Sequence, residues 1–341
     1  MSDRTEPVGT VTVPPPESGL GRLLRRGRSA GSSPVAGIAL AYVVVAATFS
    51  ILSPQFLTQT NLSIVVGQTA AVTIASFAMT MVILSGGIDL SVGAVLALAS
   101  VIVGVLLDNG QPVVLAVVVA LAVSAAVGLI NGLVTVRWRV QPFLVTLGTL
   151  SVARGLAEFI AGGGTVPILH AGFNNAFAGE IGGIPVPAIW TLGFLILGHV
   201  TLRHTVFGRR LYSIGGNEEA AVQAGTRVGR VKVLVYVLSG LFAGFASMVA
   251  TARLSSGLPG SGVGFELDVI AAVVLGGTGF RGEGGSVIGT LFGALIIGTV
   301  GNGLTLLGVD PSIQRVVKGG IILAAIVLDA ARTRRQSRAA R

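Results

Sequence analysis

Residues 112–136 read PVVLAVVVALAVSAAVGLINGLVTV, and the run ends against Arg137 and Arg139. No side chain within it is charged. A helix that crosses the hydrocarbon core of a bilayer needs about 20 consecutive apolar residues. The stretch therefore predicts a transmembrane helix with a positively charged end.

The whole chain shares this apolar character. Of its 341 residues, 52% are hydrophobic and 11% are charged, whereas about a quarter of the residues of a soluble domain are charged. The apolar runs predict an all-α integral membrane protein with about ten transmembrane helices in one membrane domain, residues 34–330. Besides 112–136, these runs are 34–52, 61–84, 90–107, 142–161, 186–202, 231–251, 264–280, 284–301 and 313–329.

The distribution of Lys and Arg predicts the orientation. With the N-terminus inside, most of the 23 basic residues fall in cytoplasmic segments, as the positive-inside rule requires. Both termini are then cytoplasmic, with a disordered, basic, Pro-rich tail at 1–33 and a second basic tail at 331–341. A secretory signal is the alternative for the N-terminal region, but the run 34–52 is long and many spans follow it.

The segment near 264–285 differs from the other runs. Glu266 and Asp268 begin it and a Gly-rich stretch ends it, which predicts a broken or re-entrant element whose polar groups are satisfied by protein or by a water-filled cavity. Its GGTGFRGEGG run contains a GxGxxG pattern. Because the pattern lies between two apolar runs and not in a βαβ unit, dinucleotide binding is not expected.

Small residues recur at helical spacing. Gly240 and Gly244 are four residues apart, as are Gly285, Gly289 and Gly293. This spacing is typical of membrane helices that pack closely, and a hinge or pathway role is the alternative.

The residue types that are missing exclude several kinds of chemistry. There is no Cys, the three His residues lack metal-ligand spacing, and neither Lys follows a GxxxxG frame. We therefore expect no metal site, no cofactor bound by this chain and no ATPase site of its own. No enzyme constellation stands out. The net charge of +9 is spread between apolar segments, so no nucleic-acid partner is expected.

The loop 203–230, RHTVFGRRLYSIGGNEEAAVQAGTRVGR, is built differently. It predicts a tight turn at two glycines, an N-cap at Asn217, two acidic residues in the first turn of a short helix, and a glycine that ends this helix. Such a helix is a rigid docking element, and the alternative is a solvated basic loop that only sets topology. The residues of this element are Gly215, Gly216, Asn217, Glu218, Glu219, Ala220, Ala221 and Gly225.

Polar residues inside apolar runs are the candidates for a solute pathway. Asp89 follows two glycines and is expected to cap the third span, a role that is compatible with contact to a hydroxylated solute. For the other candidates, interhelical hydrogen bonding is the alternative to a pathway role. Arg154 and Glu158 lie four residues apart and are expected to pair, or else to line the path. The pathway candidates are Asp89, Ser91, Asn131, Thr146, Thr149 and Asn302.

Four segments together resemble one known family. They are the loop 203–230, SGGIDLSVGAVLALAS at 85–100, QPFLVTLGTLSVARGLA at 141–157, and the run from ELDVIAAVVLGGTGFRGEGG to TLLGV at 266–309. They are similar to the ribose-type, or simple-sugar, permeases of ATP-binding-cassette importers, and the likeness covers most of residues 61–329.

This resemblance implies a membrane-spanning permease subunit that works as a homodimer or as a pseudo-dimer with a second permease. ATPase subunits, which hold ATP and Mg, would seat the helix of the loop 203–230, making it a coupling loop. An extracytoplasmic solute-binding protein would deliver a sugar or a similar small polar solute at the cytoplasmic membrane of a prokaryote. The alternative function is a self-sufficient secondary transporter or channel, which mid-span carboxylates and inverted repeats would favour.

Overall fold

The computed structural model describes residues 34–279 and 284–339. The expected N-terminal tail therefore lies outside the described residues. Every expected span falls on a helix, and the helices begin and end within a few residues of the predicted limits, except that the last helix continues further. The helices are α2 (Pro34–Leu52), α3 (Gln59–Leu84), α4 (Val92–Asp108), α5 (Val113–Trp138), α6 (Pro142–Ile160), α7 (Ala171–Ala178), α8 (Val186–His204), α9 (Val206–Gly216), α10 (Glu218–Gln223), α11 (Val228–Leu254), α12 (Phe265–Leu275), α13 (Val287–Leu306) and α14 (Pro311–Ala339).

Seven helices of the described chain are long and apolar enough to cross a membrane, namely α2, α3, α5, α6, α8, α11 and α13. Helix α4 is apolar but has 17 residues. Helix α12 has 11 residues, so it is only about 16 Å long at 1.5 Å per residue. That is roughly half the thickness of the hydrocarbon core, as a broken element requires.

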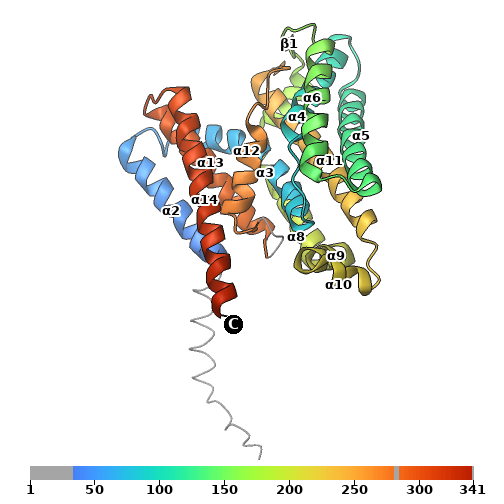
Figure 1. The fold of residues 1–341 in the computed structure, drawn as a ribbon. Coiled ribbons are helices and arrows are strands. Elements are labelled where there is room, and N and C mark those ends of the chain that lie inside the picture. Colours follow the sequence, from blue (N-terminus) through green and yellow to red (C-terminus); the bar gives the residue numbers. More distant parts are fainter. Residues whose placement is uncertain (1–33, 280–283, 340–341) are drawn as a thin grey trace, which may run out of the picture.

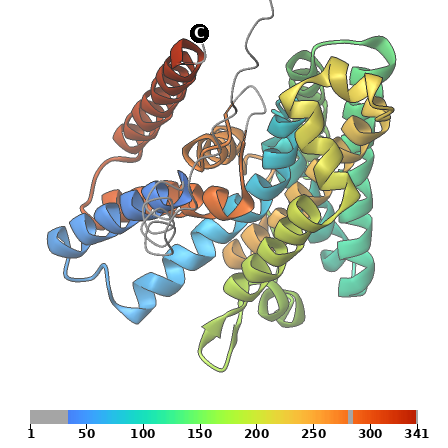
Figure 2. The ribbon, with the colours of Figure 1, turned by 90° about the horizontal axis from the view of Figure 1, so that it is seen from below.

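The helices form two groups around α3 (Figure 1). Helices α4, α5, α6 and α11 lie on one side, and α2, α13 and α14 lie on the other, with α12 packed against both α3 and α13. Seen from below, α2 and α14 are on the side of the molecule away from α5 (Figure 2). The core that joins the groups is made of buried side chains such as Ile74 and Met81 on α3, Val235 on α11 and Val273 on α12.

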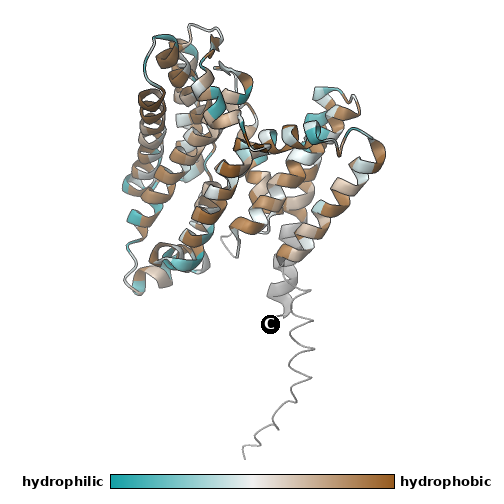
Figure 3. Ribbon diagram, turned by 180° about the vertical axis from the view of Figure 1, so that it is seen from behind, coloured by the Kyte–Doolittle hydropathy of each residue, from teal (hydrophilic) through white to brown (hydrophobic). Residues whose placement is uncertain are grey.

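The faces of α5 show how these residues suit a bilayer. Its buried face consists of small or polar side chains such as Ala116, Ala120 and Ser124, whereas large apolar side chains such as Val114 and Val118 point outward. Apolar residues predominate along the membrane-length helices (Figure 3), and many of the large ones are exposed. In lipid, exposing apolar side chains costs nothing, and small residues at the interface let helices approach closely.

Glycines make the closest helix contacts, as expected. A methyl group at Gly240 on α11 would collide with the backbone carbonyl of Ser124 on α5, and one at Gly293 on α13 would collide with the carbonyl of Ala272 on α12. Gly285 departs from the prediction, because it lies before α13 and has a φ of +107°.

Four short strands lie in the connections between helices. The sequence predicted no strands. Strands β1 (Val166–Pro167) and β4 (Ser256–Gly257) pair antiparallel, and β2 (Glu180–Ile181) pairs with β3 (Ile184–Pro185) as a hairpin. These pairs satisfy backbone groups of the loops, and the protein remains essentially all-α.

Candidate functional site

Helix α10 has the local structure that its sequence predicts. The side chain of Asn217 caps it, since Oδ1 accepts a 2.9 Å hydrogen bond from the backbone N–H of Ala220. Glu218 and Glu219 occupy the first turn, where the helix dipole favours negative charge. The chain then leaves the helix through Gly225, whose φ of +80° suits glycine. Of the α10 side chains, only Ala221 is buried, so the rest of α10 is presented outward.

The prediction of a tight turn at Gly215 and Gly216 is wrong. Both glycines belong to the last turn of α9. Helix α9 begins at the N-cap Thr205, and it buries Leu211 and Ile214 against the bundle. Burial of this apolar face keeps the chain helical through both glycines, and the change of direction occurs at Asn217, which has extended backbone.

The α9–α10 segment contacts both groups of helices. Glu218 Oε2 on α10 accepts a 2.8 Å hydrogen bond from Lys232 Nζ on α11. The hydroxyl of Tyr212 on α9 donates a 2.9 Å hydrogen bond to the carbonyl of Gly285, just before α13. Burial raises the pKa of Tyr212, while Arg203 acts in the opposite direction. The hydroxyl therefore stays protonated at neutral pH and can donate.

Asp89 lies in the break between α3 and α4 and is buried. Its Oδ1 accepts hydrogen bonds from the backbone N–H and the hydroxyl of Ser91, at 2.9 and 2.6 Å. Its Oδ2 accepts a 2.7 Å hydrogen bond from the hydroxyl of Ser239 on α11. The predicted capping role is therefore partly wrong. Ser91 occupies the N-cap position of α4, and the Asp89 carboxylate instead joins this break to α11.

The network continues across two more helices. Asn131 on α5 donates a 2.9 Å hydrogen bond to the hydroxyl of Ser91, and its Oδ1 accepts a 2.7 Å bond from Thr149 on α6. Thr146, one turn earlier on α6, donates to the backbone carbonyl of Ile88 at 3.3 Å. All the pathway candidates except Asn302 thus meet in one cluster, which is buried except for the partly exposed Thr149. We call it the Asp89 network, and it consists of Asp89, Ser91, Asn131, Thr146, Thr149 and Ser239.

Asn302 belongs to a different contact. Its side-chain amide and that of Asn61 exchange hydrogen bonds of 2.9 and 3.1 Å, and both residues are buried. This pair links α13 to α3 and is separate from the Asp89 network.

The prediction that Arg154 pairs with Glu158 is also wrong. Arg154 Nη1 donates hydrogen bonds of 2.5 Å to the carbonyls of Pro259 and Ser261. Among the described residues, no ion pair joins Arg154 to Glu158. The loop before α12 offers two carbonyls to the guanidinium, and this non-local contact replaces the expected contact along α6.

The sequence pattern did not point to three residues that make these contacts, namely Ser239, Lys232 and Tyr212. A buried carboxylate requires hydrogen-bond donors, so Asp89 indicated that a polar partner exists on another helix. The sequence contains many Ser and Thr residues within apolar runs, however, and only the packing of α11 against the break selects Ser239.

Comparison with known proteins agrees with the motifs. Residues 61–326 match the family model described as branched-chain amino acid transport system / permease component. The chain is 46% identical over 301 residues to the ribose import permease protein of Bacillus subtilis (strain 168), covering 87% of this chain and 91% of that protein. It is 38% identical over 343 residues to the L-arabinose ABC transporter permease protein of Azospirillum brasilense, covering 98% and 97%.

A third relative, the D-allose transport system permease protein of Escherichia coli (strain K12), is 40% identical over 290 residues, covering 84% of this chain and 88% of the relative. No solved structure matches the chain. The family description names an amino acid system, whereas these relatives are named for sugars. The chain therefore belongs to this permease-component family, and within it to the ribose-type sugar permeases of ATP-binding-cassette importers that its motifs resemble.

Proposed function

We propose that this permease subunit carries a sugar or a similar small polar solute across the cytoplasmic membrane of a prokaryote by alternating access, driven by a separate ATPase. The observation that carries the proposal is the likeness, over nearly the full chain, to permeases named for ribose, L-arabinose and D-allose. The seven membrane-length helices support the location in a membrane.

In the proposed topology about ten segments enter the membrane, and both termini are cytoplasmic. Helix α11 supports this orientation. Lys232 and Arg253 lie near its two ends, about 30 Å apart at 1.5 Å per residue, which matches the hydrocarbon thickness. The basic α9–α10 segment adjoins the Lys232 end and would then face the cytoplasm.

Helix α10 is the proposed contact for the ATPase subunit, which would hold ATP and Mg²⁺. Its N-cap fixes its start, and the ion pair of Glu218 with Lys232 ties it to α11. Val222 is exposed on α10 although it is apolar, which suits a surface that a partner covers. Because the segment also touches the region before α13 through Tyr212, movement of α10 would act on both groups of helices.

The other proposed partners are a second permease copy or a related permease, and an extracytoplasmic solute-binding protein.

The Asp89 network is the proposed inner part of the pathway. In the conformation described, its polar groups are bonded to one another. They would contact solute only in a state in which α11 has moved away from the break between α3 and α4.

The test is co-expression of this chain with its ATPase subunit and binding protein, followed by ATPase and uptake assays in proteoliposomes. We expect Glu218→Ala/Glu219→Ala and Val222→Asp to weaken copurification of the ATPase or to abolish its response to loaded binding protein. Val140→Asp is the matched control, because Val140 is an exposed apolar residue in the loop between α5 and α6, on the same proposed side of the membrane but outside α10.

Unchanged assembly and coupling in the α10 variants would show that α10 does not transmit ATPase closure. Uptake by this chain alone, without the ATPase subunit, would instead support the secondary transporter or channel.

A further inference from the structure

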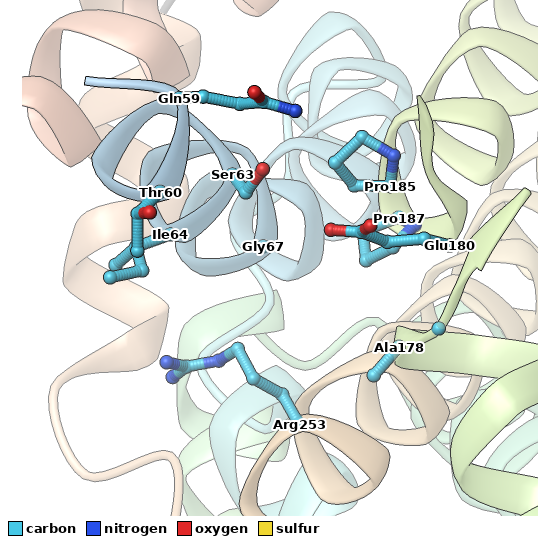
Figure 4. Close-up of a pocket in the computed structure, with 11 residues that line it drawn as sticks. Gln59, Thr60, Ser63, Ile64, Gly67, Ala178, Glu180, Pro185, Pro187 and Arg253 are labelled. Atoms are coloured by element: carbon cyan, nitrogen blue, oxygen red, sulfur yellow. The ribbon is translucent and has the colours of Figure 1, made fainter. Parts of the chain in front are cut away.

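A cavity of about 400 Å³ lies at the end of the bundle opposite α10. The first turns of α3, the β2–β3 hairpin, the start of α8 and the last turn of α11 surround it (Figure 4). Its polar lining is made of Gln59, Thr60, Ser63, Glu180 and Arg253. Cavities of 300–1,000 Å³ are typical of small-molecule sites.

The position of the cavity along α11 indicates the side of the membrane to which the cavity opens. Arg253 is in the last turn of this helix, two residues beyond the expected span 231–251, whereas Lys232 near the other end pairs with α10. The two residues are separated by about 30 Å along the helix axis. If α10 faces the cytoplasm, the cavity opens to the outside.

Two opposite charges line the cavity without forming a pair. Among the described residues, neither Arg253 nor Glu180 takes part in an ion pair. Figure 4 shows the Glu180 carboxylate directed into the space between the hairpin and α3, with the Gln59 amide above it. The Arg253 chain passes close to Gly67 on α3, where an added Cβ would lie 3.3 Å from its Cδ. Gly67 therefore gives the guanidinium room at the cavity wall.

The chemistry of the lining favours a neutral ligand with many hydroxyl groups. A guanidinium only donates hydrogen bonds, a carboxylate only accepts them, and amide and hydroxyl side chains do both. The hydroxyl groups of a polyol both donate and accept, so they can hydrogen-bond to each of these kinds of group. A net charge on the solute would be attracted by one of Glu180 and Arg253 and repelled by the other, so the lining as a whole favours no net charge.

We propose that this cavity is an outward-facing holding site for a neutral polyhydroxylated solute such as a monosaccharide, bound by Arg253 and Glu180 with Gln59, Thr60 and Ser63. This site rests on the proposed function, because it is where a solute released outside would first meet the permease. Arg253, on α11, would place the solute on the same helix that contacts α10.

The chain contains no Cys, so Ser63→Cys introduces a single thiol into the cavity wall. The experiment uses spheroplasts that express the complete importer and measures the rate at which a membrane-impermeant thiol reagent labels Cys at this position. D-ribose is the neutral probe, and alanine is the zwitterionic probe. Asp108→Cys is the matched control, since Asp108 is an exposed residue at the end of α4 and does not line the cavity.

We expect both thiols to react from outside. D-ribose at ten times its dissociation constant should slow labelling of Ser63→Cys about tenfold by mass action, should leave Asp108→Cys unchanged, and should lose its effect when Glu180→Gln or Arg253→Met is added. The labelling rate without ribose and the size-exclusion profile show whether these double variants remain folded.

Three results would overturn the site: no labelling of Ser63→Cys from outside, protection by alanine but not by D-ribose, or equal protection with and without the Glu180 and Arg253 changes. ATPase-driven uptake by the same importer separates this site from the proposed function. Normal uptake without protection rejects the cavity alone, whereas absence of ATP-dependent uptake rejects the function itself.

Discussion

Ser239 on α11 donates a 2.7 Å hydrogen bond to the buried carboxylate of Asp89, and it lies seven residues after Lys232, which pairs with Glu218 of α10 at 2.8 Å. Residues seven apart lie on the same face of a helix. One face of α11 therefore contacts both α10 and the Asp89 network. The proposed ATPase contact and the buried Asp89 network are thus joined to the same helix, seven residues apart.

Ser239→Ala should destabilise the protein by about 1–3 kcal/mol, because it removes a donor from a buried carboxylate. The measurement is thermal unfolding of the purified protein in detergent. Ser247→Ala is the control, since the Ser247 hydroxyl on the same helix donates only to the backbone carbonyl of Leu96, at 2.7 Å. Loss of this neutral bond should cost about 0.5–1.5 kcal/mol. Equal shifts for the two variants would contradict a special role of the Asp89 bond.

The Glu218–Lys232 pair should matter for coupling more than for stability. The Glu218 side chain is 53% exposed and that of Lys232 is 21% exposed. Because Glu218 lies largely in solvent, which screens the pair, we take its contribution from exposed ion pairs, about 0–1 kcal/mol. We expect Lys232→Glu to keep its melting temperature but to lose the ATPase response to loaded binding protein, and Lys232→Glu/Glu218→Lys to recover it.

Arg230→Glu is the control for reversing a charge near the start of α11, because Arg230 is exposed and forms no ion pair among the described residues. If the double charge reversal does not recover coupling, then the pair does not transmit movement between α10 and α11.

The sequence predicted the elements that depend on local pattern and missed those that depend on distant contacts. Long apolar runs marked every membrane helix, and the N-cap at Asn217 marked the start of α10. The partner of Arg154 was missed because it lies about a hundred residues away. The same reason applies to the pairing of β1 with β4 and to the bond between Asp89 and Ser239.

The wrong prediction of a turn at Gly215 and Gly216 has a different cause. Glycine is a weak helix former, so two in succession favoured a turn. Burial of Leu211 and Ile214 on α9 outweighs this propensity. The apolar spacing of that short segment was a usable signal, and its basic residues obscured it.

Gly240→Ala should disrupt the contact of α11 with α5, because its methyl group would meet the carbonyl of Ser124. Overpacking of this kind costs about 1–3 kcal/mol, which outweighs the gain in helix propensity of up to about 1 kcal/mol. Gly193→Ala on α8 is the control, since a Cβ there meets nothing within 4 Å, and it should be neutral or stabilising. Thermal melts in detergent test both, and a stable Gly240→Ala protein would contradict the close approach.

The amides of Asn61 and Asn302 should behave as a coupled pair. Hydrogen bonds between membrane helices contribute about 0.6 kcal/mol on average and up to about 1.7 kcal/mol in double-mutant cycles. We expect Asn61→Ala/Asn302→Ala to be less destabilised than the sum of the single changes, because each single change leaves a buried amide without its partner. Strict additivity of the melting shifts, converted to free energies, would mean that the reciprocal bonds do not form.

The ion pair of Lys318 on α14 with Asp268 on α12 should hold α14 to the rest of the bundle. The two groups are 2.7 Å apart, with side-chain exposures of 28% and 21%. Ile313, Val316 and Leu323 of α14 are exposed, so the pair adds to the apolar contacts that Val317, Ile321 and Ala325 make with the bundle. Lys318→Met should therefore cost about 1–3 kcal/mol. This is less than the roughly 3–5 kcal/mol for breaking a fully buried pair, since both groups keep some access to solvent.

Lys318→Met/Asp268→Leu should recover most of that loss, because two apolar side chains can replace a pair without leaving a charge unpartnered. Limited proteolysis of the loop between α13 and α14, together with thermal melting, follows the attachment of α14. Should the double variant be as unstable as Lys318→Met, the instability would come from the lost packing of the lysine chain, and the charge of Asp268 would have no part in holding α14.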